Sequence, residues 1–218
     1  MTPYYEHNGI TIYHCDALDL LGMFGKGELG AIVVDPPYGI GESSTKNRTR
    51  GYLASVTDYG EFDWDGERLS VEYIAAMQRV SQHQIIFGGN YYADVLPPSS
   101  CWLVWDKDNG ATDFADCELA WTSLPRAVRK FRYRWQGMLQ EPGNDKEPRI
   151  YPTQKPLPLM RWAIGLLPPV SVICDPCMGS GSTLRAAKDL GIKAIGGDKS
   201  ERACEIAARR LSQEVLAL

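Results

Sequence analysis

The run Asp35-Pro36-Pro37-Tyr38 is the most specific chemical signal in the sequence. Its two prolines fix φ and remove two backbone N–H donors, so their carbonyls stay outside a strand ladder. At the end of a strand, a carboxylate and a proline carbonyl together can accept both hydrogens of one exocyclic amino group. Tyr38 adds a flat face for a planar ring. The run therefore predicts a site for an amine on a planar ring, although a rigid turn that ends a strand explains an isolated run of this kind about as well.

A second signal is the glycine-rich run from Asp175 to Thr183, which is typical of a tight turn between a strand and a helix. Gly179 and Gly181 allow a ligand to approach the backbone closely, and the helix that follows offers unpaired N–H groups. A dinucleotide fingerprint requires a third glycine where this chain has Leu184, and the Gly-Lys-Ser/Thr of a P-loop is missing. The turn therefore favours a compact nucleoside ligand, with a connection that binds no ligand as the alternative.

The elements that position these residues can be predicted from hydrophobic pattern. Short apolar runs rich in β-branched residues predict buried strands. They cover residues 10–13, 31–34, 84–87, 101–105, 171–174 and 193–196. Helical periodicity covers residues 69–81, with Ser70 as the N-cap, and residues 157–167, 182–190 and 202–211. Strands that alternate with helices indicate an α/β fold with a mostly parallel, doubly wound sheet.

Four of the predicted strands are followed directly by a carboxylate. These are Asp16, Asp35, Asp175 and Asp198. One such aspartate is usually a turn former or a helix cap. In open α/β sheets, however, ligands bind beyond the carboxyl ends of the strands, so four together predict a ligand crevice. Asp198 is placed to accept both ribose hydroxyls of a nucleoside.

Together these motifs resemble those of the DNA amino-methyltransferases, which methylate adenine N6 or cytosine N4 with S-adenosylmethionine. Asp35 to Tyr38 matches their catalytic motif, and Asp175 to Thr183 resembles D-P-F-x-G-S-G-T-T with Cys177 in place of Phe. Residues 151–156 are similar to H-P-T-Q-K-P with Tyr151 in place of His, and residues 14–18 are similar to the family's G-D-A/S-L stretch. The catalytic motif precedes the cofactor turn, as in the permuted β subgroup. This order implies that the last strand and helix lie beside the first strand, and that the termini lie close together.

The resemblance implies a Rossmann-like methyltransferase fold in which residues 1–218 form a single catalytic domain. It implies catalytic roles for Asp35, Pro36, Pro37 and Tyr38, and no metal. The residues expected to bind S-adenosylmethionine are Asp16, Ala17, Thr153, Lys155, Asp175, Pro176, Met178, Gly179, Ser180, Gly181, Ser182, Thr183, Asp198 and Lys199. The target base must be flipped out of the duplex or be unpaired, because pairing hides its amine.

The form of the catalytic motif favours adenine N6 as the target, since cytosine N4 enzymes more often carry S-P-P-Y. Methylation of cytosine N4, methylation of RNA and a nucleic-acid-binding subunit without activity remain alternatives. An NAD-dependent oxidoreductase is disfavoured by Leu184.

The charge of the chain is a net −4, which by itself argues against a nucleic-acid partner. Its distribution points the other way, because residues 119–140 contain no acid and residues 43–56 carry only basic charges. The residues expected to contact DNA are Lys46, Arg48, Arg50, Arg126, Arg129, Lys130, Arg132 and Arg134. In residues 130–135 basic and aromatic side chains alternate, so an extended strand presents one face of each kind. A solvated edge strand is the alternative. Residues 105–143 are the candidate target-recognition insertion, and residues 43–56 are expected to form a loop that closes over the flipped base.

Localisation and remaining partners are predicted from composition. No apolar run approaches the roughly 20 residues of a membrane helix, and no secretory signal is visible, so a cytoplasmic protein without a membrane partner is expected. The six cysteines follow no framework spacing, and Cys174 and Cys177 are expected to be small buried residues around a turn. Residues 87–92 are expected either to line the base pocket or to form a glycine bend with aromatics in the core. A homodimer remains open.

Overall fold

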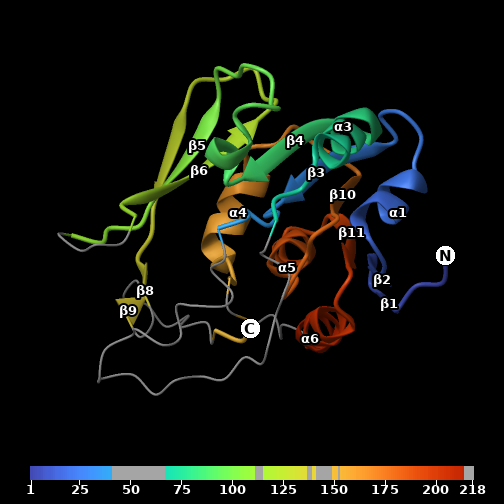
Figure 1. The fold of residues 1–218 in the computed structure, drawn as a ribbon. Coiled ribbons are helices and arrows are strands. Elements are labelled where there is room, and N and C mark those ends of the chain that lie inside the picture. The colour runs from blue at the N-terminus through green and yellow to red at the C-terminus, as the bar shows by residue number, and fades with distance from the viewer. Residues whose placement is uncertain (41–66, 111–114, 137–138, 141–148, 152, 214–218) are drawn as a thin grey trace.

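The computed structural model describes residues 1–40, 67–110, 115–136, 139–140, 149–151 and 153–213. Within them, one sheet has the order β1-β2-β11-β10-β3-β4-β6-β5-β7 (Figure 1). Its strands are β1 (Tyr5–His7), β2 (Ile10–His14), β3 (Leu29–Val34), β4 (Ser81–Phe87), β5 (Trp102–Asp106), β6 (Cys117–Thr122), β7 (Arg129–Arg132), β10 (Val172–Asp175) and β11 (Lys193–Asp198). Strands β8 (Trp135–Gln136) and β9 (Leu139–Gln140) form a separate pair.

Helices cover both faces of this sheet (Figure 1). On one face α4 (Leu157–Gly165), α5 (Ser182–Asp189) and α6 (Glu201–Ser212) pack on a core that includes Ala31 and Val33 of β3. On the other face α1 (Ala17–Gly22) and α3 (Val71–Val80) pack on a core that includes Ile32 and Val34. Alternate residues of β3 thus enter different cores, which explains why the whole strand is buried and reads as a continuous apolar run.

The order in which the chain adds strands to the sheet reverses between β10 and β3, although the strands themselves run parallel. From β10 the chain proceeds through α5 to β11, which pairs in parallel on one side of β10, whereas β3 pairs in parallel on the other side and leads through α3 to β4. This arrangement leaves a crevice at the carboxyl ends of the two central strands. Asp175 ends β10 and Asp35 directly follows β3, so the two predicted motifs meet at this point.

The permuted connectivity expected from motif order is confirmed at the two ends of the described chain. The last strand, β11, pairs in parallel with β2 from Ala194 opposite Ile10 to Asp198 opposite His14. Helix α6 then packs against β2 and β11. Residues 214–218 lie outside the described part of the chain, so the distance between the termini themselves stays a prediction.

The predicted strands and the four predicted helices are all present, and the predicted α/β fold class is confirmed. The N-cap of α3 is Ser70, although its hydroxyl donates to Glu72 and does not cap a backbone amide. Sequence reasoning missed α1, β1 and β6, and missed that β6 runs antiparallel between β4 and β5. Strands β6 and β7 make much of residues 105–143 part of the main sheet, and the recognition role of this region stays a prediction. None of the helices in the described residues is long and apolar enough to cross a membrane.

Candidate active site

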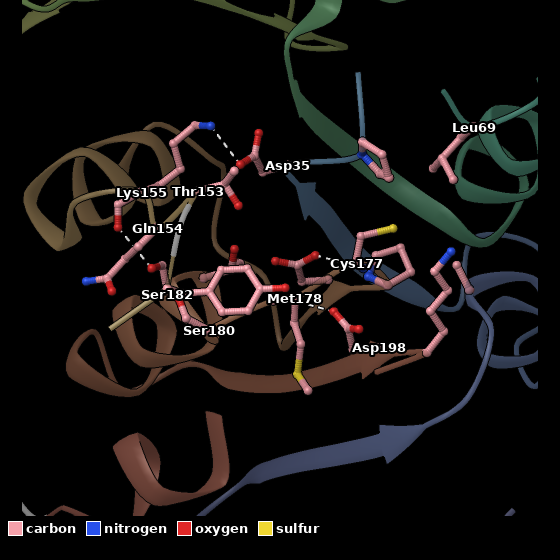
Figure 2. A pocket seen from close by; sticks show the side chains of 18 of the residues that line it. Asp35, Leu69, Thr153, Gln154, Lys155, Cys177, Met178, Ser180, Ser182 and Asp198 are labelled. Atoms are coloured by element: carbon pink, nitrogen blue, oxygen red, sulfur yellow. Dashed lines mark hydrogen bonds and ion pairs between the residues drawn. The ribbon is translucent and has the colours of Figure 1, made fainter. Parts of the chain in front are cut away.

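A cavity with about 880 Å³ of free space, partly open to solvent, lies at the carboxyl ends of β10 and β3 (Figure 2). Except for Gly181, all the residues predicted to bind the cofactor line this cavity, and so do Asp35 and Pro37. The two motifs therefore share one cavity, although they are 140 residues apart in the sequence.

The glycine turn, residues 175–183, contains two glycines with positive φ and is held in place by a hydrogen bond to Asp198. Gly179 and Gly181 have φ of +49° and +73°, a left-handed conformation that favours glycine. The backbone N–H of Gly179 donates to Asp198 Oδ2 over 3.0 Å, and the N–H of Ser200 donates to Oδ1 over 2.8 Å. A Cβ on Gly181 would lie 3.0 Å from Ala207 of α6, so this glycine permits close packing with α6 and does not face the cavity.

Asp175 is a carboxylate buried beneath this turn, only 2% exposed. Burial raises the pKa of its carboxyl to about 7, even though the Thr183 hydroxyl and the Cys177 amide both stabilise the charged form. Burial likewise raises the pKa of Asp198 above its ordinary value. The cavity floor therefore carries carboxyl groups that ionise reluctantly in the absence of a cationic partner.

At the β2 end of the cavity, Asp16 caps α1 and contacts α3. One carboxylate oxygen accepts from the N–H of Leu18 over 2.8 Å, and both oxygens lie 3.1 Å from the Tyr73 hydroxyl. Tyr73 lines the cavity and was missed by sequence reasoning, together with Leu69, Tyr151, Gln154, Met160 and Cys177. Tyr151, Gln154 and Cys177 lie inside motifs that sequence reasoning had identified, whereas no motif marks Leu69, Tyr73 or Met160.

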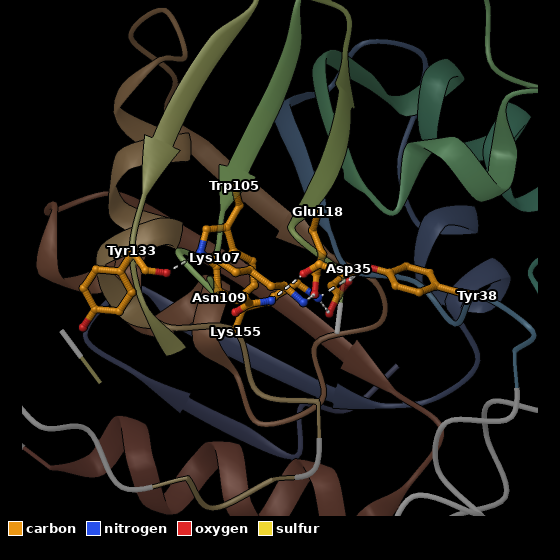
Figure 3. Close-up of polar contacts among 9 residues, drawn as sticks. Asp35, Tyr38, Trp105, Lys107, Asn109, Glu118, Tyr133 and Lys155 are labelled. Carbon is orange, nitrogen blue, oxygen red and sulfur yellow. Dashed lines mark hydrogen bonds and ion pairs between the residues drawn. The ribbon is translucent and has the colours of Figure 1, made fainter. Parts of the chain in front are cut away.

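Four charged side chains meet at the catalytic end of the site, and two of them, Asp35 and Lys155, line the cavity. Asp35 accepts a hydrogen bond of 2.5 Å from the Tyr38 hydroxyl on Oδ1 and one of 2.6 Å from Lys155 Nζ on Oδ2. Lys155 also lies 3.2 Å from Glu118 Oε2, and Glu118 Oε1 lies 2.5 Å from Lys107 Nζ (Figure 3). Glu118 and Lys107 come from β6 and from the residue that follows β5, and neither was predicted from the sequence.

The ionisation of these groups is interdependent. Burial raises the pKa of Asp35, and the nearby Glu118 charge adds to this effect while Lys155 opposes it. Burial by itself disfavours the Lys155 ammonium, but Asp35 and Glu118 overcome that effect and raise its pKa. The pKa of Glu118 is lowered, because Lys155 and Lys107 outweigh the cost of burial. Lys155 therefore stays protonated, and it holds two carboxylates at the site.

Tyr38 packs in an aromatic cluster beside the cavity and is not among the residues that line it. Its ring stacks on Tyr91, with centroids 4.8 Å apart and planes 16° apart. The ring also lies over Gly88, whose φ is +64° and where a Cβ would come within 2.0 Å of it. The Tyr92 hydroxyl donates to the Pro37 carbonyl. Residues 87–92 thus form a glycine bend with packed aromatics. The contacts of this bend with Pro37 and Tyr38 hold the catalytic motif in place.

The predicted strand with one basic and one aromatic face matches the structure only in part. Phe131 stacks on Tyr133 and on Trp162 of α4, and Tyr133 contacts Trp135, so the aromatic face packs inward as predicted. The basic side chains, however, face two acids. Lys130 pairs with Asp106 over 3.2 Å, and Arg132 and Arg134 pair with Asp108 over 2.7 and 2.6 Å. Arg126 and Arg129 are exposed and make no ion pair with the described residues. Lys46, Arg48 and Arg50 lie outside the described residues.

Cys174 and Cys177 are free thiols around the turn, as expected. Cys174 is buried, and burial raises the pKa of both thiols well above their ordinary value. No group of three or more His, Cys, Asp or Glu side chains suited to a metal ion occurs among the described residues.

Comparisons with known proteins match this geometry. The model of a DNA methylase family that acts at N6 or N4 matches residues 94–209, more than half of the chain. The chain belongs to the N6/N4 DNA methylase family. The type II methyltransferase M2.DpnII of Streptococcus pneumoniae is 25% identical over 263 aligned residues, which cover 97% of this chain and 93% of that protein.

Two solved structures share the fold. The PvuII DNA methyltransferase, described as cytosine-N4-specific, has a TM-score of 0.62 at 13% identity and covers 99% of this chain and 90% of its own. The M1.HpyAVI–SAM complex has a TM-score of 0.56 at 22% identity and covers 92% of this chain and 99% of its own. The predicted Rossmann-like methyltransferase fold is thereby confirmed, and family membership agrees with S-adenosylmethionine as the cofactor of this methylase.

The cavity of this methylase also fits such a cofactor on its own evidence. A Cβ on Gly179 would lie 3.3 Å from the Tyr151 ring and would narrow the cavity at the turn, so glycine keeps the turn open to a ligand. Carboxylates from β10 and β11 and from the start of α1 surround the cavity, which suits a ligand that carries hydroxyls and cationic groups.

Proposed function

We propose that this methylase transfers a methyl group from S-adenosylmethionine to the N6 amine of an adenine flipped out of DNA. The observation that carries the proposal is that Asp35 opens onto the same cavity as the glycine turn. A nucleoside cofactor on the turn and a base amine at Asp35 then meet in one space. Adenine is favoured over cytosine because Asp35, and not a serine, begins the catalytic motif.

When bound, S-adenosylmethionine supplies an electrophilic methyl group on a sulfonium. Asp198, with its carboxylate fixed by the Gly179 and Ser200 amides, binds the ribose hydroxyls. Asp16, Ala17 and Lys199, which line the β2 end of the cavity, bind the adenosine half. Thr153 and Lys155 lie on the side of the methionine half, beside the turn formed by Ser180, Ser182 and Thr183. Asp175, Pro176 and Met178 form the floor below.

The base amine is a poor nucleophile, because its lone pair is delocalised into the ring. Asp35 and the Pro36 carbonyl accept its two hydrogens, draw the lone pair out of conjugation and aim it at the methyl group, so most of the catalysis is positioning. The amine loses one proton for the methyl group that it gains, and Asp35 is the carboxylate placed to accept that proton. Tyr38 leaves its hydrogen bond with Asp35 and stacks on the base.

DNA is held by the basic residues on β7 and close to its ends, chiefly through phosphates. Arg126 and Arg129 are available for these contacts directly. The pairs of Lys130 with Asp106 and of Arg132 with Asp108 lie at the surface, where solvent weakens ion pairs, so a phosphate readily replaces the acid. Lys46, Arg48 and Arg50 are proposed to contact the strand that carries the flipped base.

The test is to incubate the protein with labelled S-adenosylmethionine and duplex DNA of varied sequence, digest the DNA to nucleosides and identify the labelled one. The expected result is N6-methyladenosine in its deoxy form, absent for Asp35→Ala although this variant still binds S-adenosylhomocysteine. Detection of labelled N4-methylcytosine would instead identify cytosine as the target base. Label only in RNA, or full activity of the Asp35→Ala protein, would overturn the proposal.

A further inference from the structure

Glu118 is a second carboxylate close to Asp35; it contacts Lys155 behind the cavity lining, and neither the catalytic motif nor the cofactor turn accounts for it. It lies on β6, opposite Trp105 of β5, and its side chain is 24% exposed. Each of its oxygens faces a different lysine, Lys107 at 2.5 Å and Lys155 at 3.2 Å. Burial of the Glu118 carboxylate costs desolvation free energy, and the two lysine ammonium groups that face it offset this cost.

Lys155 is the link between this carboxylate and the catalytic one. Its ammonium lies 2.6 Å from Asp35 and 3.2 Å from Glu118, and the residue is 8% exposed. Its backbone carbonyl accepts from the Ser182 hydroxyl over 2.9 Å, so the base of the side chain is tied to the cofactor turn (Figure 2). The ammonium can therefore shift between two carboxylates while its backbone stays in place.

The hydrogen bonds of Asp35 make such a shift useful. One oxygen accepts from Tyr38 and the other from Lys155. Departure of Tyr38 frees one oxygen for the base amine, but the Lys155 ammonium on the other oxygen still makes Asp35 a poor proton acceptor. For Asp35 to accept the proton of the amine, Lys155 must also move away from it, and a cation released into a buried site without a partner would be costly. Glu118 offers that partner at nearly the same place, and Lys107 keeps Glu118 ionised and in position (Figure 3).

We propose that Glu118, held by Lys107, is a positioning residue that takes over the Lys155 ammonium when the target amine binds to Asp35. It thereby keeps Asp35 free to accept the amine and basic enough to receive its proton. This inference rests on the proposed function of Asp35. It adds the β5–β6 hairpin to the parts of the fold that serve catalysis.

The test compares the full-length wild type with Glu118→Gln and Lys107→Met. In Glu118→Gln, Lys155 has only Asp35 as a charged partner, so the amine competes poorly. We expect kcat to fall about ten- to a hundredfold, as for the loss of one charged hydrogen bond, with an unchanged Kd for S-adenosylhomocysteine. The matched control is Asp116→Asn, which alters an exposed carboxylate two residues away and should keep wild-type kcat.

A second readout does not depend on activity. The carboxyl carbon of Asp35 is titrated by NMR in the protein without cofactor, with Asp35→Asn to assign the signal. Removing the Glu118 charge should move the midpoint to lower pH. Lys107→Met leaves Glu118 to Lys155 alone and should move it to higher pH. The other titratable groups facing Asp35 are Tyr38, Tyr92, Asp175 and Cys177, which all three proteins share.

Opposite midpoint shifts together with the loss of kcat support the proposal, and general structural damage would not produce opposite signs. A wild-type kcat and an unmoved midpoint in Glu118→Gln would overturn it, as would midpoint shifts of the same sign in both variants. If Glu118→Gln does not fold, the direction of the shift in Lys107→Met decides alone. A wild type that methylates no DNA would refute the proposed function instead, and the NMR titration still tests the charge arrangement.

Discussion

Replacement of Asp175 by Asn should make the protein without cofactor more stable at neutral and alkaline pH. The carboxyl of Asp175 has a pKa of about 7 in the folded protein against 3.8 for the ordinary group, mainly because it is buried. The interval is about three pH units, and one unit corresponds to about 1.4 kcal/mol, so ionisation costs the folded state about 4 kcal/mol at most.

The sign of the effect follows from proton binding. Between about pH 4 and pH 7 the folded state binds this proton more tightly than the unfolded chain, so the free energy of unfolding falls as the pH rises through this window. Asn has nearly the same shape and still accepts a hydrogen bond from the Cys177 amide, which Asp175 Oδ1 now accepts over 3.1 Å. The variant therefore keeps the local geometry and removes the ionisation.

The assay is urea unfolding of both proteins at intervals from pH 4.5 to pH 8.5. The stability difference should favour the Asn variant increasingly up to about pH 7.5 and then level off. S-adenosylhomocysteine added to the wild type should reduce the difference if its ammonium group offsets the buried charge. Parallel stability curves over the whole range would refute the reasoning, because they would mean that Asp175 ionises as readily in the fold as in the open chain.

Three further changes test other parts of the site. Gly88→Ala places a Cβ 2.0 Å from the Tyr38 ring at a positive φ, and we expect a loss of about 1–3 kcal/mol in urea unfolding together with slower methyl transfer; unchanged values would disprove the packing argument. Arg210→Met removes three hydrogen bonds to the cofactor turn and should weaken S-adenosylhomocysteine binding about tenfold by calorimetry, whereas Arg209→Met, at an exposed site, should not. Arg129→Ala should reduce the slope of log affinity against log salt for DNA by about 0.9 if it contacts one phosphate, and an unchanged slope would exclude that contact.

The sequence was most informative where the parallel part of the sheet decides position. Asp16, Asp35, Asp175 and Asp198 each follow an apolar run, and parallel strands bring their carboxyl ends to one edge, so their convergence on the cavity was predictable. Gly181 was predicted to bind the ligand, but a glycine in such a turn permits either close approach of a ligand or close packing of another helix. Contact with α6 is the one observed, and the motif alone does not distinguish them.

The parts that were missed depend on pairings with no local pattern. Glu118 and Lys107 meet Lys155 only because β6 inserts antiparallel between β4 and β5, and this pairing is set by tertiary packing. The acids that face the basic strand are Asp106 and Asp108. The parallel pairing of β5 with β7 brings those acids to Arg132 and Arg134, and this pairing has no local signal in the sequence.

The order of strands in the sheet also has a consequence for synthesis of the chain. Strands β2 and β3 are synthesised before β10 and β11, which lie between them in the sheet. Strand β2 can pair with β1 and strand β3 with β4, but each lacks its second native neighbour until β11 and β10 have been made, and such long-range pairings slow folding. A nascent chain that stops before β10 has exposed strand edges next to the future cofactor cavity, a state prone to aggregation. Completion of the sheet and completion of the cofactor site therefore depend on the same two strands, β10 and β11.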